Sequence, residues 1–109
     1  MARTISSIKE IPPTPVAFLY FTPSQFIVGV NGEEPHAKLL ESITVEKPVL
    51  IAGGRISLTD GIVMVNPSGG SSMFVDFSRD PRFSYEKAIA YLKTLPDAAG
   101  KDFRIVSSK

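Results

Sequence analysis

The chain contains a single histidine, His36, the one side chain expected to titrate near neutral pH without special help. It follows Pro35, and proline is favoured at the first position of a helix. The positive end of a helix disfavours the protonated imidazole. We therefore take His36 as the candidate catalytic residue, a neutral base or nucleophile, against the alternative of an exposed histidine with no chemical role.

A candidate anion site follows the apolar run at residues 49–52. Gly53 and Gly54 can offer backbone N–H groups there, and the guanidinium of Arg55 can pair with an anion through two hydrogen bonds. The alternative interpretation is a β-bulge at the two glycines, followed by an arginine that faces solvent.

Composition excludes several kinds of chemistry. The chain has no cysteine, so it cannot hold a disulfide, a thiolate zinc site or a cysteine nucleophile. One histidine cannot build a multi-histidine metal centre within one chain. We therefore expect no metal site and no cofactor.

A third candidate site interleaves aromatic and basic residues at Phe74, Arg79 and Arg82. Single-stranded nucleic acid is held by this combination, because bases stack on rings while phosphates pair with cations. Asp76 and Asp80 offset both arginines, and the net charge of the chain is only +1. Nucleic-acid binding is therefore an alternative that we do not favour.

Short strands and tight turns must position these residues. Residues 16–21 and 25–30 are β-branched and aromatic and flank a Thr-Pro-Ser turn, which predicts a hairpin. Asp60 and Gly61 predict a second hairpin, with a type I′ turn. In that register Thr59 pairs with Ile62, and one face carries the core residues Ile56, Leu58, Val63 and Val65. The opposite face carries Arg55, Ser57, Thr59, Ile62 and Met64.

Two helices, two more strands and an arm complete the prediction. Residues 33–42 begin with acidic residues and Pro35, as a helix start does. Ser84 is a favourable N-cap for a second helix, in which Tyr85, Ala88, Ile89 and Leu92 recur at helical spacing. Residues 73–77 and 103–107 are expected to be strands. Residues 1–15 hold three prolines and predict an extended arm, laid on the surface or docked on a partner.

The predicted fold class is α+β. Two helices on one face of a mainly antiparallel sheet of five to seven strands form a two-layer sandwich. We expect a single α+β domain over residues 16–109, preceded by the extended N-terminal arm at residues 1–15.

The order of three motifs resembles the Janus-type phosphohistidine phosphatases. His36 followed by alanine stands at a helix start, Gly53, Gly54 and Arg55 precede Ile56, and Ser78 precedes the second helix. The resemblance implies a small α+β phosphatase with His36 as catalytic residue and Arg55 and Ser78 near the phosphate. The chain departs from the family pattern where Ser24 replaces a strand lysine and where Arg-Asp-Pro follows Ser78.

We take the function to be that of a non-catalytic binding or protein-interaction module, with self-association as one form of it. No assembled catalytic set is visible, and Ile62 and Met64 on the second face of the hairpin need cover from a helix or another subunit. The alternatives are a phosphoryl hydrolase that uses His36 and a single-stranded nucleic-acid binder. No signal peptide and no apolar run of about 20 residues is seen, so we expect a cytoplasmic protein without a membrane partner.

Overall fold

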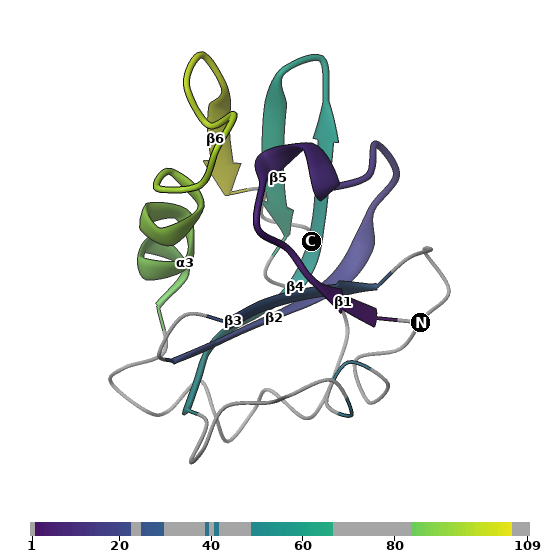
Figure 1. The fold of residues 1–109 in the computed structure, drawn as a ribbon, viewed down its shortest axis with the longest axis vertical. Helices are drawn as coiled ribbons and strands as arrows, with labels where there is room; N and C mark the ends of the chain where they lie inside the picture. Colours follow the sequence, from purple (N-terminus) through teal and green to yellow (C-terminus); the bar gives the residue numbers. More distant parts are fainter. Residues whose placement is uncertain are drawn as a thin grey trace.

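Two hairpins and two edge strands form a mixed six-stranded sheet in the computed structural model of this chain, and a helix packs against it (Figure 1). The structure describes residues 2–22, 25–29, 39, 41, 49–66 and 84–105. The strands are β1 (Ala2–Thr4), β2 (Val16–Thr22), β3 (Gln25–Gly29), β4 (Val49–Thr59), β5 (Ile62–Asn66) and β6 (Asp102–Ile105). Their order across the sheet is β1-β3-β2-β4-β5-β6.

The first predicted hairpin is confirmed. β2 and β3 pair antiparallel, with Phe18 opposite Val28 and Leu19 opposite Ile27. Every residue of β3 is buried, as are the described side chains of β2. These two strands therefore carry apolar residues on both faces, because successive side chains of a strand point to opposite sides.

The second predicted hairpin is confirmed in its register. Thr59 pairs with Ile62, and the pairing continues along β4 and β5 to Arg55 opposite Asn66. Asp60 and Gly61 have φ of 54° and 75°, the positive values that a type I′ turn requires at both central residues. The turn and the apolar pattern select the same register.

β4 is one long strand that contains a β-bulge. The bulge lies at a position that the sequence did not indicate. Tyr20 faces Ala52 while Phe21 faces Leu50, so Ile51 is the extra residue of a bulge. Gly53 and Gly54, where the sequence permitted a bulge, pair in register with β2 opposite Leu19 and Phe18.

The first residues of the chain join the domain instead of lying on its surface. β1 pairs antiparallel with β3, and a short 3-10 helix, η1 (Ile8–Glu10), follows. The apolar residues Ile5, Ile8 and Ile11 are buried in the core. The proline segment also docks on the sheet, because proline carbonyls still accept hydrogen bonds. Leu58 N donates to Pro12 O at 2.8 Å.

The predicted second helix is confirmed as α3 (Tyr85–Leu92), with Ser84 as its N-cap. The Ser84 hydroxyl accepts from the Lys87 amide at 3.3 Å. The Ser84 amide donates to Ile51 O at 2.7 Å, and the Tyr85 hydroxyl donates to Gly53 O at 2.6 Å. The start of α3 is therefore attached to the part of β4 that β5 does not reach.

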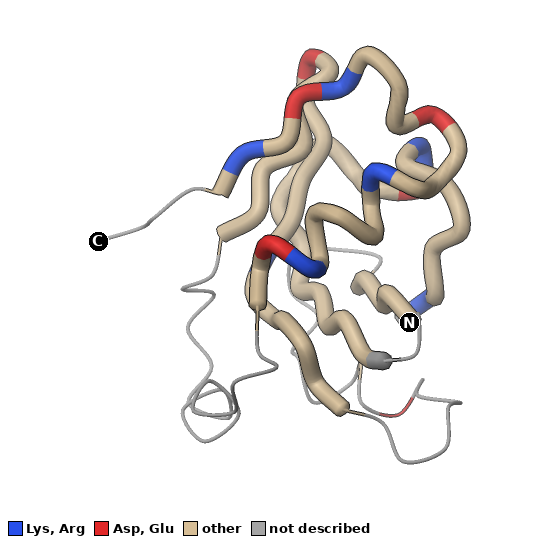
Figure 2. The backbone as a smooth tube through the Cα atoms, turned by 90° about the vertical axis from the view of Figure 1, so that its left-hand side faces the viewer, with Lys and Arg blue, Asp and Glu red and all other residues tan. Residues whose placement is uncertain are grey.

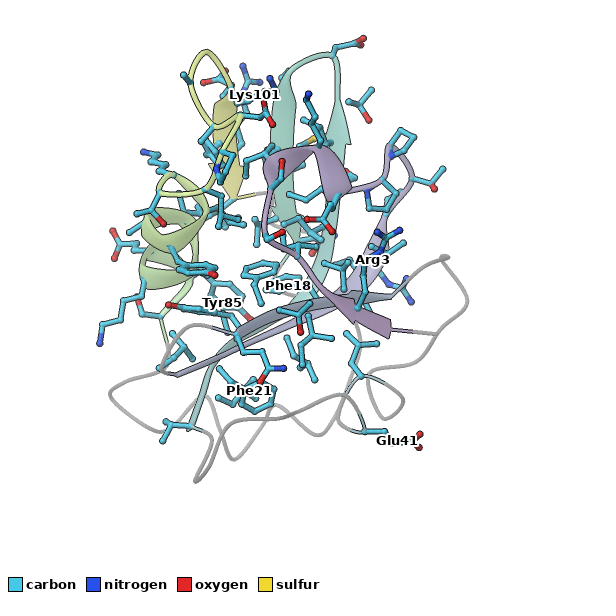
Figure 3. All side chains as sticks on the ribbon, viewed as in Figure 1. Arg3, Phe18, Phe21, Glu41, Tyr85 and Lys101 are labelled. Carbon is cyan, nitrogen blue, oxygen red and sulfur yellow. The ribbon has the colours of Figure 1, made fainter. Side chains whose placement is uncertain are left out.

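Two hydrophobic clusters lie on opposite faces of the sheet, as the labelled Phe18 and Phe21 show (Figure 3). The first face carries the larger cluster, against which α3 packs through Ala88 and Leu92. The second face carries a smaller cluster of Ala17, Leu19, Phe21, Ile27, Leu39 and Leu50.

The expected two-layer arrangement, with both helices on one face, requires a correction. Leu39 is helical and fully buried, and it belongs to the cluster on the second face, whereas α3 packs on the first. The central strands are buried on both faces, so no single layer can cover them. Among the described residues α3 is the one complete α-helix. Of the helix expected at 33–42, the described residues include Leu39 and Glu41.

The sheet is mixed, although most of its pairings are antiparallel. β6 runs parallel to β5, because the chain crosses over through α3 before it returns to the sheet. Gly100, with φ of 80°, lies in the turn that leads into β6. The strand expected at residues 73–77 lies outside the described residues.

Candidate binding groove on the second face

A groove of about 310 Å³ lies on the second face, where the β4–β5 hairpin extends beyond the second cluster. Its described lining residues are Pro15, Arg55, Ile56, Ser57, Met64 and Asn66. The hairpin register explains four of these residues, because Arg55 is opposite Asn66 and Ser57 is opposite Met64. Cross-strand partners and alternate residues of a strand share one face.

The groove combines an apolar surface with a few polar groups. Met64 is 37% exposed, one of two large hydrophobic side chains that are exposed among the described residues. Ser57 is only 5% exposed, and Arg55 is half-buried. A mainly apolar surface with few polar groups is typical of a binding site.

The described lining residues do not form a catalytic set. They include one hydroxyl, at Ser57, and no histidine or carboxylate that could act as its base. A serine without a base is a weak nucleophile. Elsewhere in the described part of the chain, no group of three or more histidine, aspartate or glutamate residues gathers to hold a metal ion.

Charge is distributed without a dominant sign. Figure 2 shows acidic and basic residues interspersed along the described chain. Several of these charges pair with each other, as Arg3 does with Glu10 at 3.5 Å and Arg104 with Asp102 at 2.9 Å. Such a surface provides little long-range attraction for a polyanion.

Three residues of the predicted anion site lie in the described part of the chain. Arg55 lines the groove, whereas Gly53 and Gly54 are buried in the paired stretch of β4. Burial raises the pKa of Tyr85, which keeps its hydroxyl protonated as a donor to Gly53 O. The other predicted site residues, His36, Ser78, Phe74, Arg79 and Arg82, lie outside the described residues.

Some groove residues had a signal in the sequence and others had none. The alternation around the Asp60-Gly61 turn places Arg55, Ser57 and Met64 on one face. Nothing local to Pro15 indicates that it borders the same groove, because that contact depends on how the proline segment follows β4.

No helix in the described ranges has the length and apolar character needed to cross a bilayer. Comparison with protein families, with curated proteins and with solved structures finds no match to this chain.

Proposed function

We propose that this chain is a non-catalytic protein-interaction module whose groove over β4 and β5 binds an extended segment of a partner protein. The observation that carries the proposal is the 37% exposure of Met64 in a groove that also contains the buried Ser57 and the half-buried Arg55 and Asn66. A large apolar side chain beside polar groups at the end of a sheet is characteristic of a recognition surface.

The lining residues specify the chemistry of the bound segment. Met64 and Pro15 can contact an apolar side chain, and methionine adapts its shape to different partners. The Ser57 hydroxyl and the Asn66 amide can pair with the backbone of an extended peptide. Arg55 favours an acidic residue close to the apolar one.

Selection from a random peptide library displayed on phage, with the whole protein immobilised, tests this proposal. We expect enrichment of peptides in which an apolar residue neighbours an acidic one. These peptides should bind at least about tenfold more weakly to the Met64→Glu variant, because a carboxylate replaces the apolar contact and repels the acidic residue.

The Lys87→Glu variant is the matched control, because it introduces the same side chain on the exposed surface of α3. It should bind the selected peptides as the wild type does. Failure to enrich any peptide, or equal binding by the Met64→Glu variant, would exclude the groove as the interaction site.

One observation favours a second candidate, a phosphohistidine-phosphatase-like hydrolase. Arg55, the expected anion clamp, lines a groove. If this candidate is correct, the wild type releases phosphate from a phosphohistidine peptide. The His36→Ala and Arg55→Ala variants should both lose this activity. Activity that survives either substitution, or no activity in the wild type, removes it.

A further inference from the structure

β6 forms the edge of the sheet, and its backbone has a defined orientation. The Asp102 amide donates at 2.9 Å to the carbonyl of Gly61, the residue before β5, so the backbone polar groups of Asp102 face β5. Because these groups alternate along a strand, those of Phe103 and Ile105 point away from β5. Within the described part of the chain, β5 is the one strand that pairs with β6, and Figure 2 faces this edge.

The charged side chains of β6 are of opposite sign. Natural edges are commonly protected by charged side chains that discourage pairing with another strand. β6 carries one acid and one base two positions apart, Asp102 and Arg104, which pair with each other at 2.9 Å and whose side chains are 62% and 59% exposed. Ile105, 46% exposed, is the other large hydrophobic side chain that the described residues leave open.

This arrangement is complementary to itself in antiparallel pairing. If two β6 strands pair about Phe103, Asp102 of each copy lies opposite Arg104 of the other. Phe103 then forms the hydrogen-bonded pair, and the charged residues occupy the non-hydrogen-bonded positions, where side chains approach most closely. Both opposite-charge contacts form at once, because a two-fold interface repeats every contact.

Neighbouring registers lack this complementarity. A shift by one residue places Asp102 opposite Ile105, and a shift by two places Arg104 opposite Arg104 of the second copy. Like charges directly opposite each other destabilise a strand pair. In the favoured register Ile105 lies opposite Lys101 of the other copy, whose aliphatic stem can cover it.

We propose that two copies of this chain associate through antiparallel pairing of their β6 strands, which continues the sheet across a two-fold axis. The interface uses the backbone edge of β6, which lies beside the groove, because Arg104 is the cross-strand neighbour of Met64. The partner is a second copy of this chain, because its β6 places an Arg104 opposite Asp102 and an Asp102 opposite Arg104.

Reversing either charge on β6 tests the proposed dimer. Sedimentation velocity of the whole protein over a range of concentrations measures the association. We expect a concentration-dependent monomer–dimer equilibrium for the wild type. Asp102→Arg places two arginines opposite each other, and Arg104→Asp does the same with two aspartates. Each variant alone should dimerise about tenfold more weakly or worse.

Mixing the two variants should restore association as a one-to-one heterodimer. Positions 102 and 104 of the two strands in the mixture again join an arginine to an aspartate. The control Lys87→Glu, on α3, should dimerise as the wild type does. Thermal melting checks that each variant folds, and the two variants test the contact independently.

Three results would overturn the proposal. The wild type could remain a monomer up to millimolar concentration, both variants could dimerise as strongly as the wild type, or the mixture could fail to associate. Peptide binding at the groove is tested separately by the Met64→Glu variant, which leaves β6 unchanged.

Discussion

The two ends of the sheet differ in how they are covered. Around β2 and β3, both faces are buried, and adjacent residues such as Phe26 and Ile27 enter different clusters. In β5 the pattern alternates, because Val63 and Val65 are buried while Met64 is exposed between them. The first end thus provides stability, and the second leaves apolar side chains available for contacts with other molecules.

The two ends of the sheet should differ most in the free energy of unfolding that is lost when a side chain is shortened to alanine. Phe26 is fully buried and its ring stacks on Phe18 at 5.1 Å. Phe26→Ala should lower the free energy of unfolding by about 3–5 kcal/mol. Met64→Ala, at the other end, should change it by less than about 0.5 kcal/mol. Equal losses in urea unfolding would show that both ends are packed alike.

A smaller loss of stability is expected from a substitution in the turn between β4 and β5. Gly61 has φ of 75°, and a Cβ there would meet no atom within 4 Å, so Gly61→Ala introduces backbone strain without a clash. The expected loss of stability is about 1 kcal/mol. Asp60→Asn is the control, because asparagine tolerates the φ of 54° at that position. A loss from the control as large as that from Gly61→Ala would contradict a strain mechanism.

The smallest expected effect is a pH dependence at the β1 end. Glu10 accepts from the Ser6 amide at 2.7 Å, and mainly this hydrogen bond lowers the pKa of Glu10 below its ordinary value of 4.5. A lowered pKa stabilises the fold above pH 4.5, and this contribution is lost as the pH falls through the lower folded value.

Glu10→Gln should therefore lower stability by less than about 1 kcal/mol at pH 7, and the difference from wild type should vanish in acid. Melting temperatures of both proteins between pH 7 and pH 2 provide the measurement. A difference that stays constant across this range would show that the Glu10 charge has no role.

Local patterns predicted the hairpins and the second helix but not the burial of the first residues. Pro12 and Pro13 favour an extended segment, and this local signal led to the expectation of an arm. Ile5, Ile8 and Ile11 recur at every third position, the period of the 3-10 helix that the structure contains. That spacing indicates a buried 3-10 helix, whereas the prolines favoured an extended arm.

The sequence predicts which residues of the groove share a face, but it does not predict how exposed they are. Arg55, Ser57 and Met64 share a face in any register that the Asp60-Gly61 turn allows, so their alignment follows from the sequence. The exposure of Met64 does not follow from the sequence, because it depends on how far the second cluster extends along β4.

By itself the sequence determined the turns, the strand register around Asp60 and Gly61, and the cap of α3, because each depends on the backbone preferences of neighbouring residues. Only the tertiary structure decided which apolar faces are covered, that β6 runs parallel to β5, and that Ile8 is in the core. These features depend on contacts between residues far apart in the chain, which no local pattern specifies.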